Sequence, residues 1–125
     1  MTNIQLTDME VDILCHRLEI ADVIADCLFN TDEDFTFDDV EFTARTLHDT
    51  INATKTLPNA SDLDNIDKEV LAEAIEGSTW FPIMQQEYAN KNVSSQTFTK
   101  AIVSLESVER KIGQLIGRKV RAPRW

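Results

Sequence analysis

The chain has 125 residues, 42% of them hydrophobic, which is the usual size of one domain and enough to bury roughly two-thirds of the unfolded surface. Its formal charge of minus 10 is unevenly divided, because residues 1–90 hold 20 acids and 4 bases, whereas residues 91–125 hold 2 acids and 8 bases. An acidic body repels nucleic acid and anionic membranes and attracts basic surfaces, so we expect no direct nucleic-acid binding by the body.

Residues 8–29 have the pattern of a long first helix. Thr7 followed three residues later by Glu10 is a capping box, and apolar residues then recur every three or four positions from Val11 to Leu28. Further apolar residues widen this face beyond the share usual for a surface helix. We therefore expect this helix to be central and largely buried.

Both cysteines, Cys15 and Cys27, fall on this predicted helix. Their separation of twelve residues corresponds to about 18 Å along a helix axis, whereas a disulfide requires Cα atoms within roughly 7 Å. The sequence therefore predicts two free thiols, both buried among apolar neighbours.

Four more helices are predicted along the rest of the chain. A second helix is expected over residues 37–54, and the turn-rich residues 56–65 connect it to a third, capped by Ser61 or Asp64 and closed by a left-handed Gly77. Pro82 suits the first turn of a short fourth helix that ends near residue 90. A fifth helix begins at Ser94 or Ser95 and stops at Gly117, with apolar residues at alternating three- and four-residue steps.

These elements predict an all-α protein, a single-domain helical bundle of four or five helices. The acidic helical domain is expected over residues 1–117, followed by a basic tail over residues 118–125. The tail has four bases in eight residues and three open interpretations: it packs on its own molecule or is disordered, it binds a protein, or it binds nucleic acid.

The most acidic stretch, residues 30–41, has six acids among twelve residues and two interpretations. Its spacing resembles the calcium loop of the EF-hand family, in which six positions supply oxygen ligands. The resemblance places these ligands at Asn30, Asp32, Asp34, the carbonyl of Thr36, Asp38 and Glu41. The sequence departs from the family at the sixth position, where Phe35 replaces the glycine that the sharp turn requires.

The second interpretation of this stretch is a helix start. Thr36 is then the N-cap, Phe35 and Val40 form a hydrophobic staple, and the flanking acids lie at the positive end of the helix. We predict the helix start and no metal site, with a calcium-responsive module as the alternative.

No catalytic constellation is evident in the sequence. His16 lies between Asp12 and Glu19, a setting more typical of a surface histidine than of a metal ligand. The chain has three glycines, and none forms a phosphate-cradling loop. We therefore expect no enzymatic activity and no cofactor.

Carboxylates recur along the outer faces of the predicted helices, roughly 5–11 Å apart, which is comparable with phosphate spacing along nucleic acid. This pattern predicts a small acidic protein–protein interaction protein, of the inhibitor or DNA-mimic type, that binds and blocks or shields a basic protein or nucleoprotein complex. The alternative is a structural or accessory subunit with no inhibitory role. The candidate binding residues are Asp12, Glu19, Asp22, Asp26, Glu69, Glu73 and Glu76.

The sequence also leads to an expectation about the cellular location of the protein. No apolar run approaches the ~20 residues that span a bilayer, and the first residues lack a secretory signal pattern. We expect a cytoplasmic protein without membrane contact. The sequence leaves the oligomeric state open, including a homodimer.

Overall fold

The structure is a computed structural model that describes residues 4–29 and 35–124. These residues form a single all-α bundle with no β-strand, which confirms the predicted fold class. The helices are α1 (Asp8–Leu18), α2 (Ala21–Leu28), α3 (Phe37–Thr54), the short 3-10 helix η1 (Ala60–Asp62), α4 (Asn65–Glu76), α5 (Trp80–Ala89) and α6 (Ser95–Ile116). None of the helices in the described ranges is long and apolar enough to cross a bilayer.

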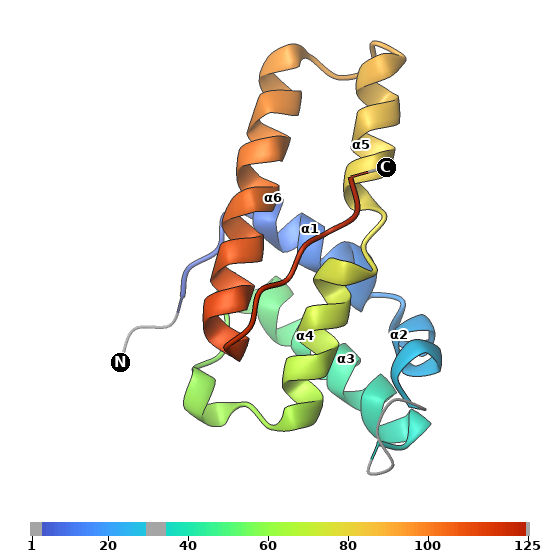
Figure 1. The fold of residues 1–125 in the computed structure, drawn as a ribbon, viewed down its shortest axis with the longest axis vertical. Coiled ribbons are helices and arrows are strands. Elements are labelled where there is room, and N and C mark those ends of the chain that lie inside the picture. The colour runs from blue at the N-terminus through green and yellow to red at the C-terminus, as the bar shows by residue number, and fades with distance from the viewer. Residues whose placement is uncertain (1–3, 30–34, 125) are drawn as a thin grey trace.

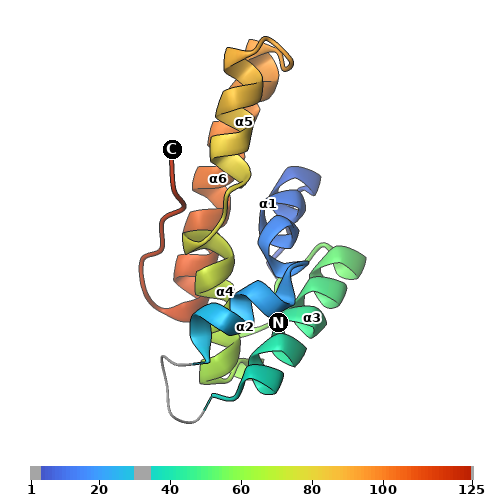
Figure 2. The ribbon, with the colours of Figure 1, turned by 90° about the vertical axis from the view of Figure 1, so that its right-hand side faces the viewer.

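The helices are arranged as a compact body with one projecting hairpin. Helices α1 to α4 and the C-terminal half of α6 make the body, whereas α5 and the N-terminal half of α6 extend from it side by side (Figures 1 and 2). Stacking of Tyr88 and Phe81 on Phe98 joins the two hairpin helices. The hairpin therefore has its own aromatic contacts.

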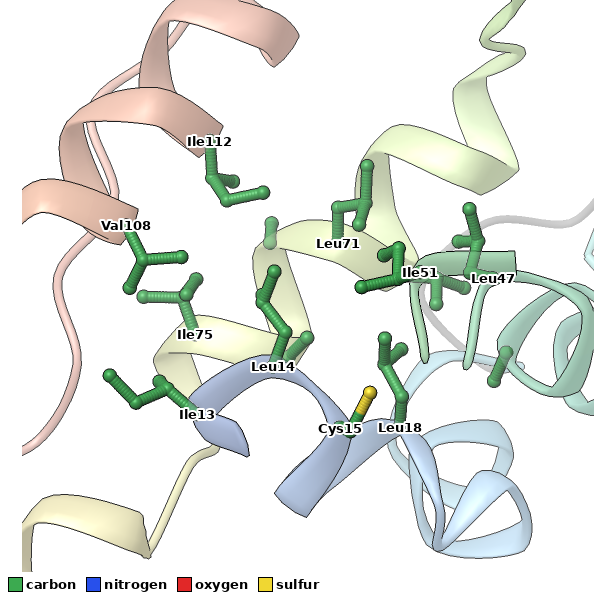
Figure 3. Close-up of a cluster of buried hydrophobic side chains, with 14 of the residues drawn as sticks. Ile13, Leu14, Cys15, Leu18, Leu47, Ile51, Leu71, Ile75, Val108 and Ile112 are labelled. Carbon is green, nitrogen blue, oxygen red and sulfur yellow. The ribbon is translucent and has the colours of Figure 1, made fainter. Parts of the chain in front are cut away.

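Helix α1 lies at the centre of the body and packs against α3, α4 and α6. Its apolar side chains meet those of the three other helices in one continuous interior (Figure 3). The labelled members are Ile13, Leu14, Cys15 and Leu18 of α1, Leu47 and Ile51 of α3, Leu71 and Ile75 of α4, and Val108 and Ile112 of α6. The expected central position of this helix is thus correct.

Local capping residues start and stop the helices largely as predicted. Thr7 and Glu10 form the capping box of α1, and the side chains of Thr36 and Ser94 accept backbone N–H groups at the starts of α3 and α6. Gly117 ends α6 with a φ of 81°, the left-handed conformation that glycine adopts without strain. Gly77 ends α4 with a φ of −98°, so the predicted left-handed closure is wrong there.

The single helix predicted over residues 8–29 is wrong, because the chain turns at Glu19 and Ile20. Ile20 has φ −100° and ψ 62°, and its N–H bonds to the carbonyl of Arg17 instead of continuing the helical pattern. No glycine or proline causes this turn. The apolar residues of a straight helix would point to several sides, whereas the turn lets the apolar face of α2 pack on α3 and α4.

The tail after Gly117 folds back along α6 and packs on its own molecule (Figure 1). Val120 and Ala122 are buried, and the guanidinium of Arg124 binds the carboxylate of Glu109 at 2.8 and 3.0 Å. A Cβ at Gly113 would lie 3.1 Å from the backbone oxygen of Arg118, so the missing side chain permits this close approach. The intramolecular interpretation therefore fits the described part of the tail.

Candidate functional site

Four of the predicted acids lie on α1 and α2. Asp12 is on α1 and Glu19 is the residue that caps its C-terminal end, about two turns later, whereas Asp22 and Asp26 are on α2, one turn apart. All four side chains are exposed, and none is paired with a base in residues 4–29 or 35–124. Because of the turn at Ile20, these acids form two short rows on two helices and not one straight stripe.

The three predicted acids on α4 have a different environment. Glu73 binds Arg17 at 2.8 Å, and Glu76 binds Arg118 at 3.3 Å, whereas Glu69 is half-buried without an ion pair to the described bases. Arg17 also donates to Sγ of Cys27 at 3.6 Å, so it links α1, α2 and α4. Much of the negative charge on α4 is therefore balanced within the molecule.

A fifth acid, Asp49 of α3, belongs beside the acids of α1, and sequence reasoning missed it. Burial, together with the negative charges of Asp12, Glu19 and Asp49, raises the pKa of the Cys15 thiol to about 11. The three acids thus act on one thiol from two helices. Only the packing of α3 on α1 makes them neighbours, because Asp49 is 30 residues from Glu19 in the sequence.

The thiols differ from each other, although both were predicted to be buried. Cys15 is buried and Cys27 is exposed, and both are free. The prediction for Cys27 is wrong because the turn at Ile20 changes the direction of α2 and leaves this residue outside the core.

An exposed apolar residue separates the two acidic rows along the chain. Ile20 is 39% exposed at the junction of α1 and α2, with Glu19 directly before it and Asp22 two residues later. Phe29, at the end of α2, is 37% exposed and contacts the ring of Phe37 edge-on. The acidic rows are therefore accompanied by accessible hydrophobic area.

The candidate calcium ligands are only partly within the described residues. Asn30, Asp32 and Asp34 lie outside them. The hydroxyl of Thr36 accepts from the backbone N–H of Asp39 at 3.1 Å, as the predicted helix start requires, and Glu41 pairs with Arg45 at 3.6 Å.

Each histidine has a hydrogen-bond partner among the described residues. His16 Nε2 lies 3.0 Å from the hydroxyl of Thr79, which links α1 to the start of α5. His48 Nδ1 lies 3.0 Å from a carboxylate oxygen of Asp49. Within residues 4–29 and 35–124, no group of three or more acids, histidines and cysteines is arranged to hold a metal ion.

Comparisons with known proteins assign the chain to no family. No protein-family model, no curated protein and no solved structure matches the chain. The function therefore has to follow from the chemistry of the molecular surface.

Proposed function

We propose that the chain is a non-enzymatic interaction protein that binds a basic partner and blocks or shields it. The binding surface, called the α1–α2 acidic surface below, consists of Asp12, Glu19, Asp22 and Asp26, with Asp49 of α3 at its edge. One observation carries the proposal: the first four acids are exposed and unpaired with any base of the described chain, whereas Glu73 and Glu76 of α4 are paired with Arg17 and Arg118.

Uncompensated carboxylates are suited to attracting a basic surface. Their potentials add over the protein surface, raise the rate of encounter with positively charged partners and disfavour acidic ones. Within each row the acids are one or two helical turns apart, roughly 5–11 Å, so their spacing is comparable with that of nucleic-acid phosphates. A protein whose own ligand is nucleic acid is accordingly the kind of partner we propose.

Burial of hydrophobic area would supply binding free energy that exposed charges alone do not. Exposed ion pairs are each worth only about 0–1 kcal/mol, whereas a desolvated apolar side chain near the centre of an interface contributes more. Ile20 lies between the acidic rows in the chain, and its exposed side chain is available for such burial. We therefore propose that the acids mainly raise the rate of association, and that burial of Ile20 supplies a larger share of the binding free energy.

The test starts with capture of basic proteins from native lysate at low salt, followed by titration of the captured protein by calorimetry. Asp22→Asn/Asp26→Asn should weaken binding about tenfold and flatten its salt dependence. The matched control, Asp62→Asn/Glu87→Gln, removes the same charge from η1 and from the projecting hairpin, and should retain most of the affinity.

Two results contradict the proposal. Equal weakening in the test and control variants would mean that net charge, and not the α1–α2 acidic surface, controls binding. If no basic protein is captured at low salt and released at higher salt, the proposed class of partner is wrong.

A further inference from the structure

A hollow of about 710 Å³ lies between α6 and the folded-back tail, outside the α1–α2 acidic surface. One wall is α6 from Glu106 to Gly117, and the other is the tail from Arg118 to Arg124. Figure 1 shows the tail running back along α6. We call this hollow the tail groove.

The tail groove is basic, although the protein as a whole is acidic. Five bases and two acids line it, which gives a formal charge of plus 3. They are Arg110, Arg118, Lys119, Arg121 and Arg124, with Glu106 and Glu109. The net charge of the chain, minus 10, makes this local excess of bases distinctive.

Some of these charged side chains are already paired within the molecule. Glu109 accepts from Arg124 and, at 2.6 Å, from the backbone N–H of Ala122, and Arg118 binds Glu76. Three bases remain: Arg110, Lys119 and Arg121 are exposed and have no ion pair with any acid in residues 4–29 or 35–124. They are the cations available to a ligand.

The fold places these cations around one hollow. Gly117 reverses the chain, Gly113 lets the tail approach α6, and Val120 is buried between Lys119 and Arg121. Glu109 then fixes the far end of the tail through Arg124. The backbone that carries two of the three cations is thus anchored on both sides, which lowers the entropy lost when a ligand binds.

We propose that the tail groove binds a small phosphate-bearing ligand, with Arg110, Lys119 and Arg121 as the groups that contact phosphate. Guanidinium groups match phosphate oxygens with two parallel hydrogen bonds, and a lysine adds a point charge. The groove volume lies within the roughly 300–1,000 Å³ range of small-molecule sites.

Acids at both ends of the groove favour a compact ligand over a nucleic-acid strand. Glu76 lies beside Arg118, where the tail begins. At the other end, Glu106 lies on the α6 wall, three residues before Glu109, which binds Arg124 of the tail. A continuous polyanion leaving the groove in either direction would approach these carboxylates. A ligand of mononucleotide size would meet mainly the central cations.

The experiment is an NMR titration of the full chain labelled with nitrogen-15, at constant ionic strength maintained with chloride. Pyrophosphate is the first probe, and the expected result is saturable shifts of the backbone signals of residues 110–121. Adenosine monophosphate is the second probe: stronger binding than pyrophosphate identifies a nucleotide as the source of the phosphate, and equal or weaker binding identifies the phosphate group alone. Acetate should cause no saturable shift.

Two sets of variants separate the groove from general charge: the test set removes three positive charges from the groove, and the control set removes two from the hairpin. Arg110→Gln/Lys119→Gln/Arg121→Gln should weaken pyrophosphate binding at least about tenfold, because it removes three charged donors. Lys91→Gln/Lys100→Gln, which removes exposed lysines of the hairpin region, should leave binding within about twofold. Arg121→Gln alone is the fallback if the triple variant does not fold.

Three outcomes would overturn the proposal. These are the absence of saturable shifts in the wild-type chain, equal weakening in both sets of variants, and tighter binding of a short single-stranded oligonucleotide than of either small probe. Loss of the proposed basic-protein binding would not affect this titration, so the two proposals can fail separately.

Discussion

Replacement of Lys111 by methionine tests how the central helix is held to α6. Lys111 Nζ donates to Oε1 of Glu10 at 2.8 Å and to the backbone oxygen of Gln5 at 2.9 Å. The Glu10 side chain is 1% exposed, and its Oε2 has no hydrogen-bond partner among the described residues. The variant Lys111→Met keeps most of the aliphatic volume but leaves a buried carboxylate without its cation.

The expected loss follows from burial of the two partners. Breaking a fully buried pair by removing one partner costs about 3–5 kcal/mol, and a charged hydrogen bond contributes about 1.5–3 kcal/mol. Because the Lys111 side chain is 23% exposed, we expect the lower part of these ranges, about 2–3 kcal/mol of unfolding free energy. For a chain of this length that corresponds to a fall of about 10 °C in Tm.

The loss of stability in Lys111→Met should depend on pH. Burial acts to raise the pKa of Glu10, but hydrogen bonds from Lys111 and the Thr7 N–H, together with the nearby Ser107 hydroxyl, outweigh it and hold the pKa below the ordinary value of 4.5. The wild-type carboxylate therefore contributes stability above about pH 4.5, and this contribution is lost as pH falls through the lower folded-state pKa. In Lys111→Met, burial should raise the pKa, so the difference between the two proteins should shrink on acidification.

Urea denaturation at several pH values measures both effects, and the double variant Glu10→Gln/Lys111→Met is the control. Glutamine at position 10 still accepts the backbone N–H of Thr7, so the double variant should be more stable than Lys111→Met alone. A loss below about 0.5 kcal/mol, or a double variant no more stable than Lys111→Met alone, would refute the reasoning.

Three further predictions concern the core, a helix start and the thiols. Leu14→Ala, at a fully buried position, should cost about 2–5 kcal/mol of unfolding free energy in urea titrations, and a loss under about 1 kcal/mol would contradict the single core. Thr36→Ala should cost about 1 kcal/mol in the same assay, since the Asp39 N–H loses its acceptor; no change would argue against this cap. At about pH 8, iodoacetamide should modify exposed Cys27 well before Cys15, whose pKa is raised to about 11; mass spectrometry of the digested protein measures the order, and equal rates would contradict the burial of Cys15.

The predicted site could be found only in part from the sequence. Asp12, Glu19, Asp22 and Asp26 were identifiable because they lie off the apolar positions of the helical pattern, which predicts exposure. The ion pairs of the α4 acids and the nearness of Asp49 to Glu19 depend on which helices pack together. The excess of bases in residues 91–125 pointed toward the tail groove, but the groove itself arises from the fold-back at Gly117.

Local patterns in the sequence determined the helical class, the extent of α3, and the starts at Thr7, Thr36 and Ser94, because each depends on contacts within about one helical turn. Tertiary structure alone decided the turn at Ile20 and the pairing of Arg17 with Glu73 and of Glu10 with Lys111. The members of those pairs are 56 and 101 residues apart. A charge has many possible partners at such separations, and only the packing of α1 against α4 and α6 selects one.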